Sequence, residues 1–129
     1  MAAGGGRRER GTAAEALAAA FLARHGLEVI ARNHAIRRGE VDLVCREGDV
    51  LCFVEVRSRT SRAQGGPEET VGRRKARRVV AAATNWCTRN GGLERKIRFD
   101  VVAITFGEGE PEIAHWRDAF DASGNPSEF

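Results

Sequence analysis

Residues 39–59 read GEVDLVCREGDVLCFVEVRSR, two segments rich in valine and leucine on either side of Gly48-Asp49. A two-residue turn with glycine at its first central position, flanked by such segments, is typical of a β-hairpin. If Glu47 pairs with Val50, every opposed pair of residue numbers sums to 97. A slip of one residue would move side chains to the wrong face. The pattern favours this register because it gives one face a wholly apolar centre, made of Val41 with Val56, Leu43 with Val54 and Cys45 with Cys52.

The same register places two carboxylates, Asp42 and Glu55, opposite one another on the second face, and Glu40 opposite Arg57. Opposed residues have Cβ atoms roughly 4.5–5.5 Å apart. At an effective dielectric constant near 20, two full charges about 5 Å apart repel by roughly 3 kcal/mol. Either one carboxylate is protonated, or cations neutralise the pair, or a divalent metal ion lies between them. Oxygen ligands suit Mg²⁺ or Mn²⁺ better than zinc. The alternative is a pair of exposed acids at a frayed sheet end, each bonded to a nearby arginine.

The charge is distributed unevenly along the chain. Residues 57–98 carry 12 basic and 3 acidic side chains, whereas residues 99–129 carry 1 basic and 7 acidic. Most of the basic residues are arginines, which suit phosphate because they form bidentate hydrogen bonds and are weakly hydrated. A basic surface beside a carboxylate pair is what a metal-dependent enzyme acting on a polyanion requires. A solvated helix face that aids solubility would give the same composition.

A chain of 129 residues is expected to form one domain. We expect this domain to span residues 11–121, with residues 1–10 and 122–129 disordered. The sequence contains no run of 18 apolar residues, so no membrane span is expected. The N-terminus lacks the apolar stretch of a signal peptide. The three cysteines have no C-x-x-C spacing, which favours buried, reduced thiols and a cytoplasmic protein without zinc.

The periodicity of the chain predicts an α/β domain. Residues 12–25 are expected to form a helix with Thr12 and Glu15 as a capping box. Strands are expected at 27–34, 40–46 and 50–57, followed by a polar loop at 58–69. A second helix at 70–90 carries arginines on its outer side. A buried strand at 97–106 and a short edge strand at 112–116 follow. A three-strand meander followed by a helical crossover gives a mixed central sheet with helices packed on it.

This order of helix, three-strand meander, helix and strand, together with the acidic hairpin, resembles the restriction-endonuclease-like core of the PD-(D/E)xK nuclease superfamily. More closely, GEVDL at 39–43 and FVEVRSR at 53–59 resemble the YraN-like family of small, uncharacterised bacterial proteins. RFDV at 98–101 and Asn33 also match that pattern. The resemblance covers roughly residues 10–120. The activity it implies rests on similarity to restriction-type nucleases and archaeal Holliday junction resolvases.

Carried over by position, the resemblance implies that Asp42 and Glu55 are catalytic metal ligands for Mg²⁺ or Mn²⁺, with the Val56 carbonyl as a third ligand. Glu15 fits two interpretations equally, the capping box and the acid that junction resolvases place on their first helix. Arg57 stands where the superfamily usually has lysine. An arginine cannot serve as a general base at ordinary pH, but it can hold the phosphate and stabilise charge in the transition state. Asp100 and His115 receive no catalytic role.

The first functional hypothesis is therefore an Mg²⁺-dependent endonuclease acting on DNA, including branched or structured DNA. Backbone contacts of this kind are sequence-neutral and sensitive to salt, and they are assigned to Arg59, Arg73, Arg74, Lys75, Arg77 and Arg78. The second hypothesis is a nucleic-acid-binding module that kept the fold without catalysis. The third is an interaction protein whose basic helix docks an acidic partner protein. The resemblance is also compatible with a homodimer, because junction-cutting enzymes of this fold commonly act as dimers.

Overall fold

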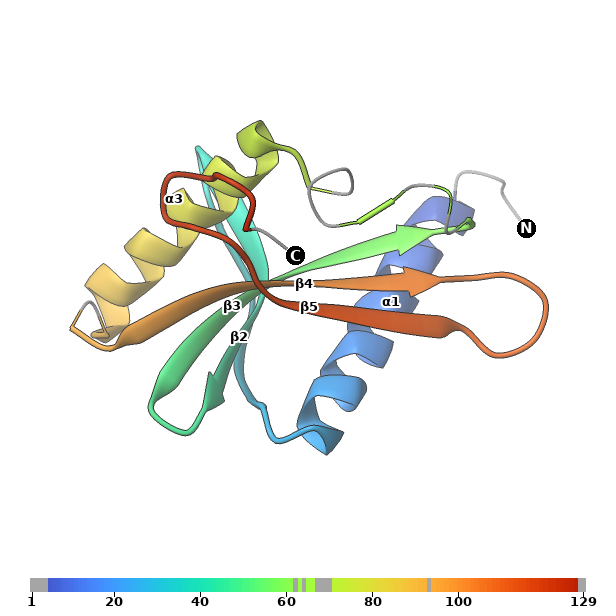
Figure 1. The fold of residues 1–129 in the computed structure, drawn as a ribbon, viewed down its shortest axis with the longest axis horizontal. Coiled ribbons are helices and arrows are strands. Elements are labelled where there is room, and N and C mark those ends of the chain that lie inside the picture. Colours follow the sequence, from blue (N-terminus) through green and yellow to red (C-terminus); the bar gives the residue numbers. More distant parts are fainter. Residues whose placement is uncertain (1–4, 62, 64, 67–70, 93, 128–129) are drawn as a thin grey trace.

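Two helices are each followed by a group of strands in a computed structural model that describes residues 5–61, 63, 65–66, 71–92 and 94–127. The elements are α1 (Gly5–Arg24), β1 (Glu28–Ile36), β2 (Gly39–Glu47), β3 (Val50–Arg59), α3 (Arg73–Asn90), β4 (Lys96–Thr105) and β5 (Glu112–Phe120) (Figure 1). The expected order of elements is confirmed. The expected loop at 58–69 lies partly outside the described residues.

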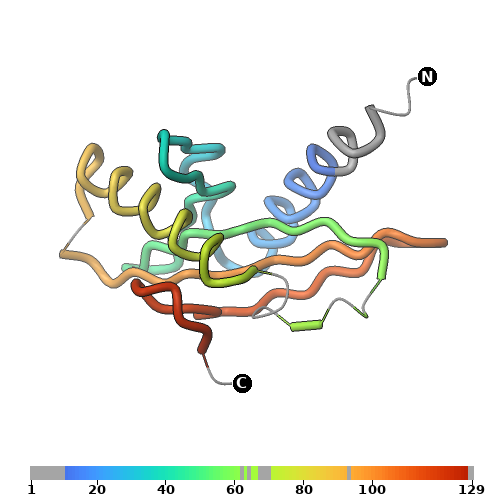
Figure 2. Tube along the Cα trace, turned by 90° about the horizontal axis from the view of Figure 1, so that it is seen from above, coloured from blue at the N-terminus to red at the C-terminus, as the bar shows by residue number. Residues whose placement is uncertain are grey.

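The strands form a single five-stranded sheet in the order β1-β2-β3-β4-β5. All neighbouring pairs are antiparallel except β3 and β4, which are parallel and joined by α3. The long strands β3, β4 and β5 run side by side (Figure 2). A parallel pair needs such a crossover connection, because a tight turn can join only antiparallel neighbours. The mixed sheet of an α/β domain is thus confirmed.

The β2–β3 hairpin adopts the predicted register, from Leu43 opposite Val54 to Glu47 opposite Val50. Cys45 and Cys52 therefore face each other, and both are buried free thiols, as expected. This register fits because it buries an unbroken run of apolar side chains on both strands.

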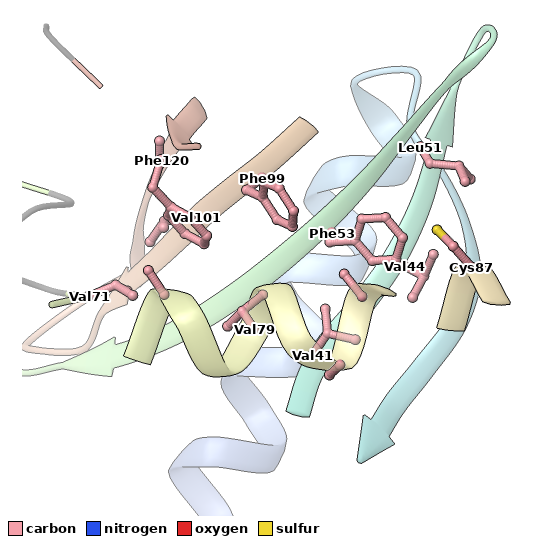
Figure 3. Packing of buried hydrophobic residues seen from close by; sticks show 14 residues of the cluster. Val41, Val44, Leu51, Phe53, Val71, Val79, Cys87, Phe99, Val101 and Phe120 are labelled. Atoms are coloured by element: carbon pink, nitrogen blue, oxygen red, sulfur yellow. The ribbon is translucent and has the colours of Figure 1, made fainter. Parts of the chain in front are cut away.

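The expected position of Val41 is wrong. Val41 packs with Val44 and Phe53 against α3 (Figure 3), and not with Leu43 on the opposite face. The alternation breaks near Asn33, which has φ of 52° and lies between the β1–β2 pairs Arg32–Leu43 and His34–Val41. Asparagine tolerates this left-handed conformation better than most residues.

The sheet is covered by one helix on each face. Alternate residues of the strands point to opposite sides, so two separate apolar clusters form. The cluster under α3 includes Val44, Leu51, Phe53, Val79, Ala82, Phe99 and Val101. The cluster under α1 includes Ala18, Leu22, Leu43, Val54, Val102 and Ile104. The central strands β3 and β4 are buried on both faces, which explains their nearly continuous apolar sequence.

Several boundaries differ from the sequence-based expectation, and the largest differences are at the two ends of the chain. The first helix begins at Gly5, so Thr12 lies inside it and is not its N-cap. Residues 5–10, expected to be disordered, belong to this helix because RRER at 7–10 consists of good helix formers. β5 runs over nine residues, well beyond 112–116. Part of the expected disordered tail folds back, since Ser127 N–H donates to the Ala119 carbonyl and Pro126 bridges Phe120.

Candidate functional site: a buried carboxylate pair beside a basic helix

Asp42 lies where β2 and β3 stop pairing. The outermost pair of the hairpin ladder is Leu43 with Val54, and Asp42 directly precedes Leu43 in the sequence. Beyond it, Val56 N–H donates a hydrogen bond of 2.8 Å to Asp42 Oδ2. A side-chain carboxylate thus accepts a hydrogen bond from β3 at the point where the strands diverge. The Val56 carbonyl was expected to be a metal ligand. The contact that the structure shows between Val56 and Asp42 is made by the Val56 N–H group.

Glu55 is the most deeply buried acid near this point, with 2% of its surface exposed. Its Oε2 lies 3.4 Å from Lys75 Nζ and 3.6 Å from Arg57 Nη1. Its Oε1 is buried and has no hydrogen-bond partner in the described chain. A buried acceptor without a partner costs free energy comparable to its desolvation, about 1–3 kcal/mol. Binding of a cation or a proton at Glu55 Oε1 would therefore stabilise this side chain.

The two carboxyl groups form an electrostatically coupled pair. Burial and the neighbouring charge of Asp42 together raise the pKa of Glu55 to about 8, against the opposing effect of Lys75. Burial also raises the pKa of Asp42, against the hydrogen bonds that its carboxylate accepts from Val56 N–H and from the protonated Glu55. Such a pair shares protons, since two adjacent buried carboxylates cannot both ionise without compensation. The two acids thus interact, but the predicted pairing of Asp42 directly opposite Glu55 is not among the β2–β3 pairs, which end at Leu43 and Val54.

Lys75 occupies a position that sequence reasoning did not assign to it. We expected Lys75 among the residues that follow a phosphate backbone, but its ammonium group reaches back from the first turn of α3 to Glu55. Arg57 contacts Glu55 as well, rather than the expected partner Glu40, which lies exposed opposite Ala35 of β1. A strand pattern cannot foresee a contact that depends on how a helix docks on the sheet.

Glu15 approaches the pair from α1, on the other face of the sheet. Burial raises the pKa of Glu15, the charge of Asp42 adds to this, and a hydrogen bond with the Asn33 side chain opposes it. With Thr12 inside the helix, the capping-box interpretation of Glu15 no longer holds. Among the described residues, no three histidine, cysteine or acidic side chains lie close enough together to bind one metal ion. Glu15 is thus an electrostatic neighbour of Asp42, and its assignment as a metal ligand stays a prediction.

The expected basic surface forms on the outer side of α3. Arg73, Arg74, Arg77 and Arg78 are all exposed. Arg59 does not belong to this surface, because only 9% of it is exposed. Its guanidinium donates to Thr105 Oγ1 and to the Gly65 carbonyl, and it lies 5.6 Å from the centre of the Trp116 ring. Arg59 therefore anchors the segment after β3.

The charges of α3 are arranged against the stability of the helix. Its first turn holds Arg73, Arg74 and Lys75, contains no acid, and follows Gly72, which forms no side-chain cap. Cations at a helix N-terminus are unfavourable because the helix dipole is positive there. The pairs Arg73–Arg77 and Arg74–Arg78 add like charges at i,i+4 spacing, each destabilising by roughly 0.2–0.5 kcal/mol. The basic residues of α3 therefore do not stabilise the helix on which they lie.

Asp100 and His115 belong to a separate buried network. Asp100 is fully buried and accepts hydrogen bonds from the Arg98 guanidinium at 2.8 and 2.9 Å, from His115 Nε2 at 2.9 Å and from Asp118 N–H at 3.0 Å. Arg98 also binds Glu47. Burial opposes ionisation of Asp100, but these hydrogen bonds keep its pKa below the usual value. The network ties β4 to β5 and to the hairpin, a structural role.

No helix in the described part of the chain is long and apolar enough to cross a membrane. This agrees with the sequence, in which charged residues interrupt every apolar segment.

Comparison with known proteins finds relatives over nearly the whole chain. A family model described as "Uncharacterised protein family UPF0102" matches residues 14–104. A UPF0102 protein of Anaeromyxobacter sp. strain Fw109-5 is 70% identical over 122 residues, covering 95% of this chain and 92% of the relative. A UPF0102 protein of Anaeromyxobacter dehalogenans is 64% identical over 126 residues, covering 98% and 94%. A more distant one from Rhodococcus jostii is 46% identical over 111 residues, covering 85% and 94%.

Proposed function

Since the chain belongs to the uncharacterised protein family UPF0102, whose name assigns no activity, we propose a function from the carboxylate pair itself. The protein binds nucleic acid and hydrolyses phosphodiester bonds with a divalent cation, Mg²⁺ or Mn²⁺. DNA, including branched or structured DNA, is the proposed substrate, and the domain is a restriction-endonuclease-like member of the PD-(D/E)xK superfamily. The observation that carries the proposal is the buried Glu55, with one unpartnered oxygen, beside Asp42 and next to a basic helix.

The donor set fits a hard divalent cation. Mg²⁺ is usually held by one or two carboxylates, with water and substrate phosphate oxygens as further ligands. Asp42 and Glu55 would hold the ion. Its charge would offset the repulsion between the two carboxylates, and it would give Glu55 Oε1 the partner that this atom lacks in the described chain. When bound, the ion would supply Lewis-acid stabilisation of the charge that develops on the scissile phosphate.

Lys75 and Arg57 connect the pair to the solvent. Their side chains are 40% and 39% exposed while their cationic ends contact Glu55. A phosphate placed at this surface would meet both cations, which would offset its charge during reaction. Arginine keeps its proton, whereas lysine can release one when a site lowers its pKa. Arg57 is therefore suited to charge stabilisation and not to proton transfer.

The test is a cleavage assay on four-way junction, flap and linear duplex DNA with Mg²⁺, Mn²⁺ or EDTA. We expect divalent-dependent nicking that falls at least a hundredfold in Asp42→Asn and in Glu55→Gln, the size of loss seen when one stabiliser of transition-state charge is removed. Glu28→Gln is the matched control, because Glu28 is an exposed carboxylate paired with Arg46. Absence of divalent-dependent cleavage on every substrate would refute the hydrolytic proposal.

Arg57 supports a second candidate function, a nucleic-acid-binding module without catalysis, because an arginine at this position can bind phosphate but cannot act as a general base. Such a module would bind DNA equally in EDTA and in Asp42→Asn, with affinity falling steeply as salt increases. Arg57→Lys separates the two candidates. A gain of cleavage in this variant would identify a weakened nuclease site, and unchanged binding without cleavage would favour the module.

A further inference from the structure

A groove runs along α3 on the side that faces the turn between β1 and β2. One hollow of about 310 Å³ is lined by Arg38, Arg74, Arg77, Arg78 and Ala81. A second hollow of about 360 Å³ is lined by Ile36, Arg38, Ala81, Thr84, Asn85 and Thr88. The hollows share Arg38 and Ala81, so they lie next to each other between α3 and the β1–β2 turn, and we refer to the two together as the groove. Arg38, to which the sequence assigned no role, lines both parts.

The close approach of the two walls depends on Gly39. A Cβ atom at this position would lie 1.9 Å from the carbonyl oxygen of Arg78. Only glycine therefore lets β2 begin directly against the backbone of α3. The preceding residue, Arg38, is brought beside the arginines of the helix as a consequence. The chain thus gathers four cations from two distant segments around one hollow.

These cations have no acidic partner within the described chain. Arg38, Arg74, Arg77 and Arg78 are exposed, and none of them forms a hydrogen bond or an ion pair through its side chain with a described acid. Elsewhere in the same chain, exposed arginines such as Arg46 and Arg117 do pair with acids. Four unneutralised guanidinium groups around one concave surface indicate an anionic ligand.

We propose that this groove binds the phosphodiester backbone of a nucleic-acid strand, away from the carboxylate pair. Arginine matches phosphate through paired N–H donors, and the far part of the groove adds the polar side chains of Thr84, Asn85 and Thr88. Protein interfaces centre on buried aromatic or large apolar anchors, and the groove offers only Ile36 and Ala81 as apolar lining. Its chemistry therefore suits a polyanion better than an acidic protein.

The helix sets the distance between the groove and the carboxylate pair. Ala81 follows Lys75 by six residues, about 9 Å along the helix axis at 1.5 Å per residue. Consecutive nucleotides of one strand rise about 3.4 Å each along a duplex. The groove therefore holds phosphates two or three nucleotides from the one at Lys75. This part of the inference rests on the proposed function, whereas the existence of the groove site does not.

The experiment compares Arg38→Ala with Arg37→Ala in full-length protein. Both arginines are exposed in the same turn, but only Arg38 lines the groove. Binding of a fluorescently labelled 12-nucleotide DNA is measured by anisotropy in EDTA over a series of salt concentrations. We expect Arg38→Ala to weaken binding about three- to tenfold and to reduce the salt slope by about 1, as for the loss of one phosphate contact. Arg37→Ala should have a clearly smaller effect, and circular dichroism should show both variants folded.

Equal effects of the two substitutions, or no binding of the DNA by the wild type, would overturn the proposal. Inorganic tripolyphosphate serves as the second probe. An Arg38-dependent affinity for tripolyphosphate as high as that for the oligonucleotide would assign the groove to small anions and overturn the backbone assignment. Because binding is measured without metal, failure of the cleavage assay leaves this result intact. Failure of the Arg38 comparison likewise leaves cleavage as a separate measurement.

Discussion

Replacing Glu55 with glutamine should stabilise the metal-free protein at neutral and alkaline pH. Glutamine has the shape of a protonated glutamate and carries no charge. In the wild type, the folded protein keeps Glu55 protonated up to a pKa of about 8, whereas the unfolded chain releases the proton near 4.5. Between these values the unfolded state binds fewer protons, so the free energy of unfolding falls as pH rises. Glutamine does not titrate, so the free energy of unfolding of Glu55→Gln does not fall in this way.

The size of the effect follows from the two pKa values. Each pKa unit corresponds to about 1.4 kcal/mol, so the difference between 4.5 and about 8 gives about 5 kcal/mol above pH 8 as an order of magnitude. At pH 7 about 3 kcal/mol of this loss has already occurred, by the same relation. Below pH 4 both states are protonated, and the advantage of the variant should vanish.

The assay is urea unfolding of the wild type and Glu55→Gln in EDTA at several values between pH 4 and pH 9. Glu110→Gln, an exposed carboxylate in the β4–β5 turn, is the control and should follow the wild type. Adding Mg²⁺ at pH 8 should raise the stability of the wild type much more than that of Glu55→Gln, because a ligand that binds only the folded state stabilises it. A wild type and variant that differ by the same amount at all pH values would refute the reasoning.

Two further substitutions probe the framework of the site. Asp100→Asn should lower the free energy of unfolding at pH 7 by roughly 3–5 kcal/mol, because it breaks a buried pair, as measured by urea unfolding. Since the pKa of Asp100 is lowered in the folded state, the difference should shrink as pH falls below 3.8, and a constant difference would contradict this. Gly39→Ala should destabilise by roughly 1–3 kcal/mol, the cost of overpacking, and should weaken DNA binding. Gly11→Ala, at a helical position with open space, should instead stabilise by about 0.5–1 kcal/mol, and equal effects of the two would contradict the contact with Arg78.

The hairpin was predictable because its physics is local. A two-residue turn fixes the register, and burial on one face penalises any slip. The recorded pairs from Leu43–Val54 to Glu47–Val50 therefore follow from the sequence alone. The parallel pairing of β3 with β4 was predictable for a related reason, since a helix between two apolar strands leaves few other topologies.

The parts that were not predictable depend on tertiary approach. Val41 lies on the other face from Leu43, beside the positive φ of Asn33 in the neighbouring strand, and only the tolerance of asparagine for positive φ gave a signal of this irregularity. Lys75 and Arg38 take their places through the docking of α3 on β2, which the contact of Gly39 with the Arg78 carbonyl fixes. A glycine next to arginines in a turn was visible in the sequence, but its partner was not.

The unfavourable features of this protein follow one another along α3. The buried carboxylate pair with raised pKa values lies beside the uncapped helix start with its three cations, and the arginines without acids line the groove along the next turns. None of them contributes to folding, and the buried network around Asp100 shows that this chain satisfies its other buried charges. A divalent cation would neutralise the carboxylates and a phosphate backbone would neutralise the arginines, so each unfavourable feature has a ligand of opposite charge. Binding of those ligands would offset what the free protein loses, which is the reason to expect the cation and the phosphate backbone along the same helix.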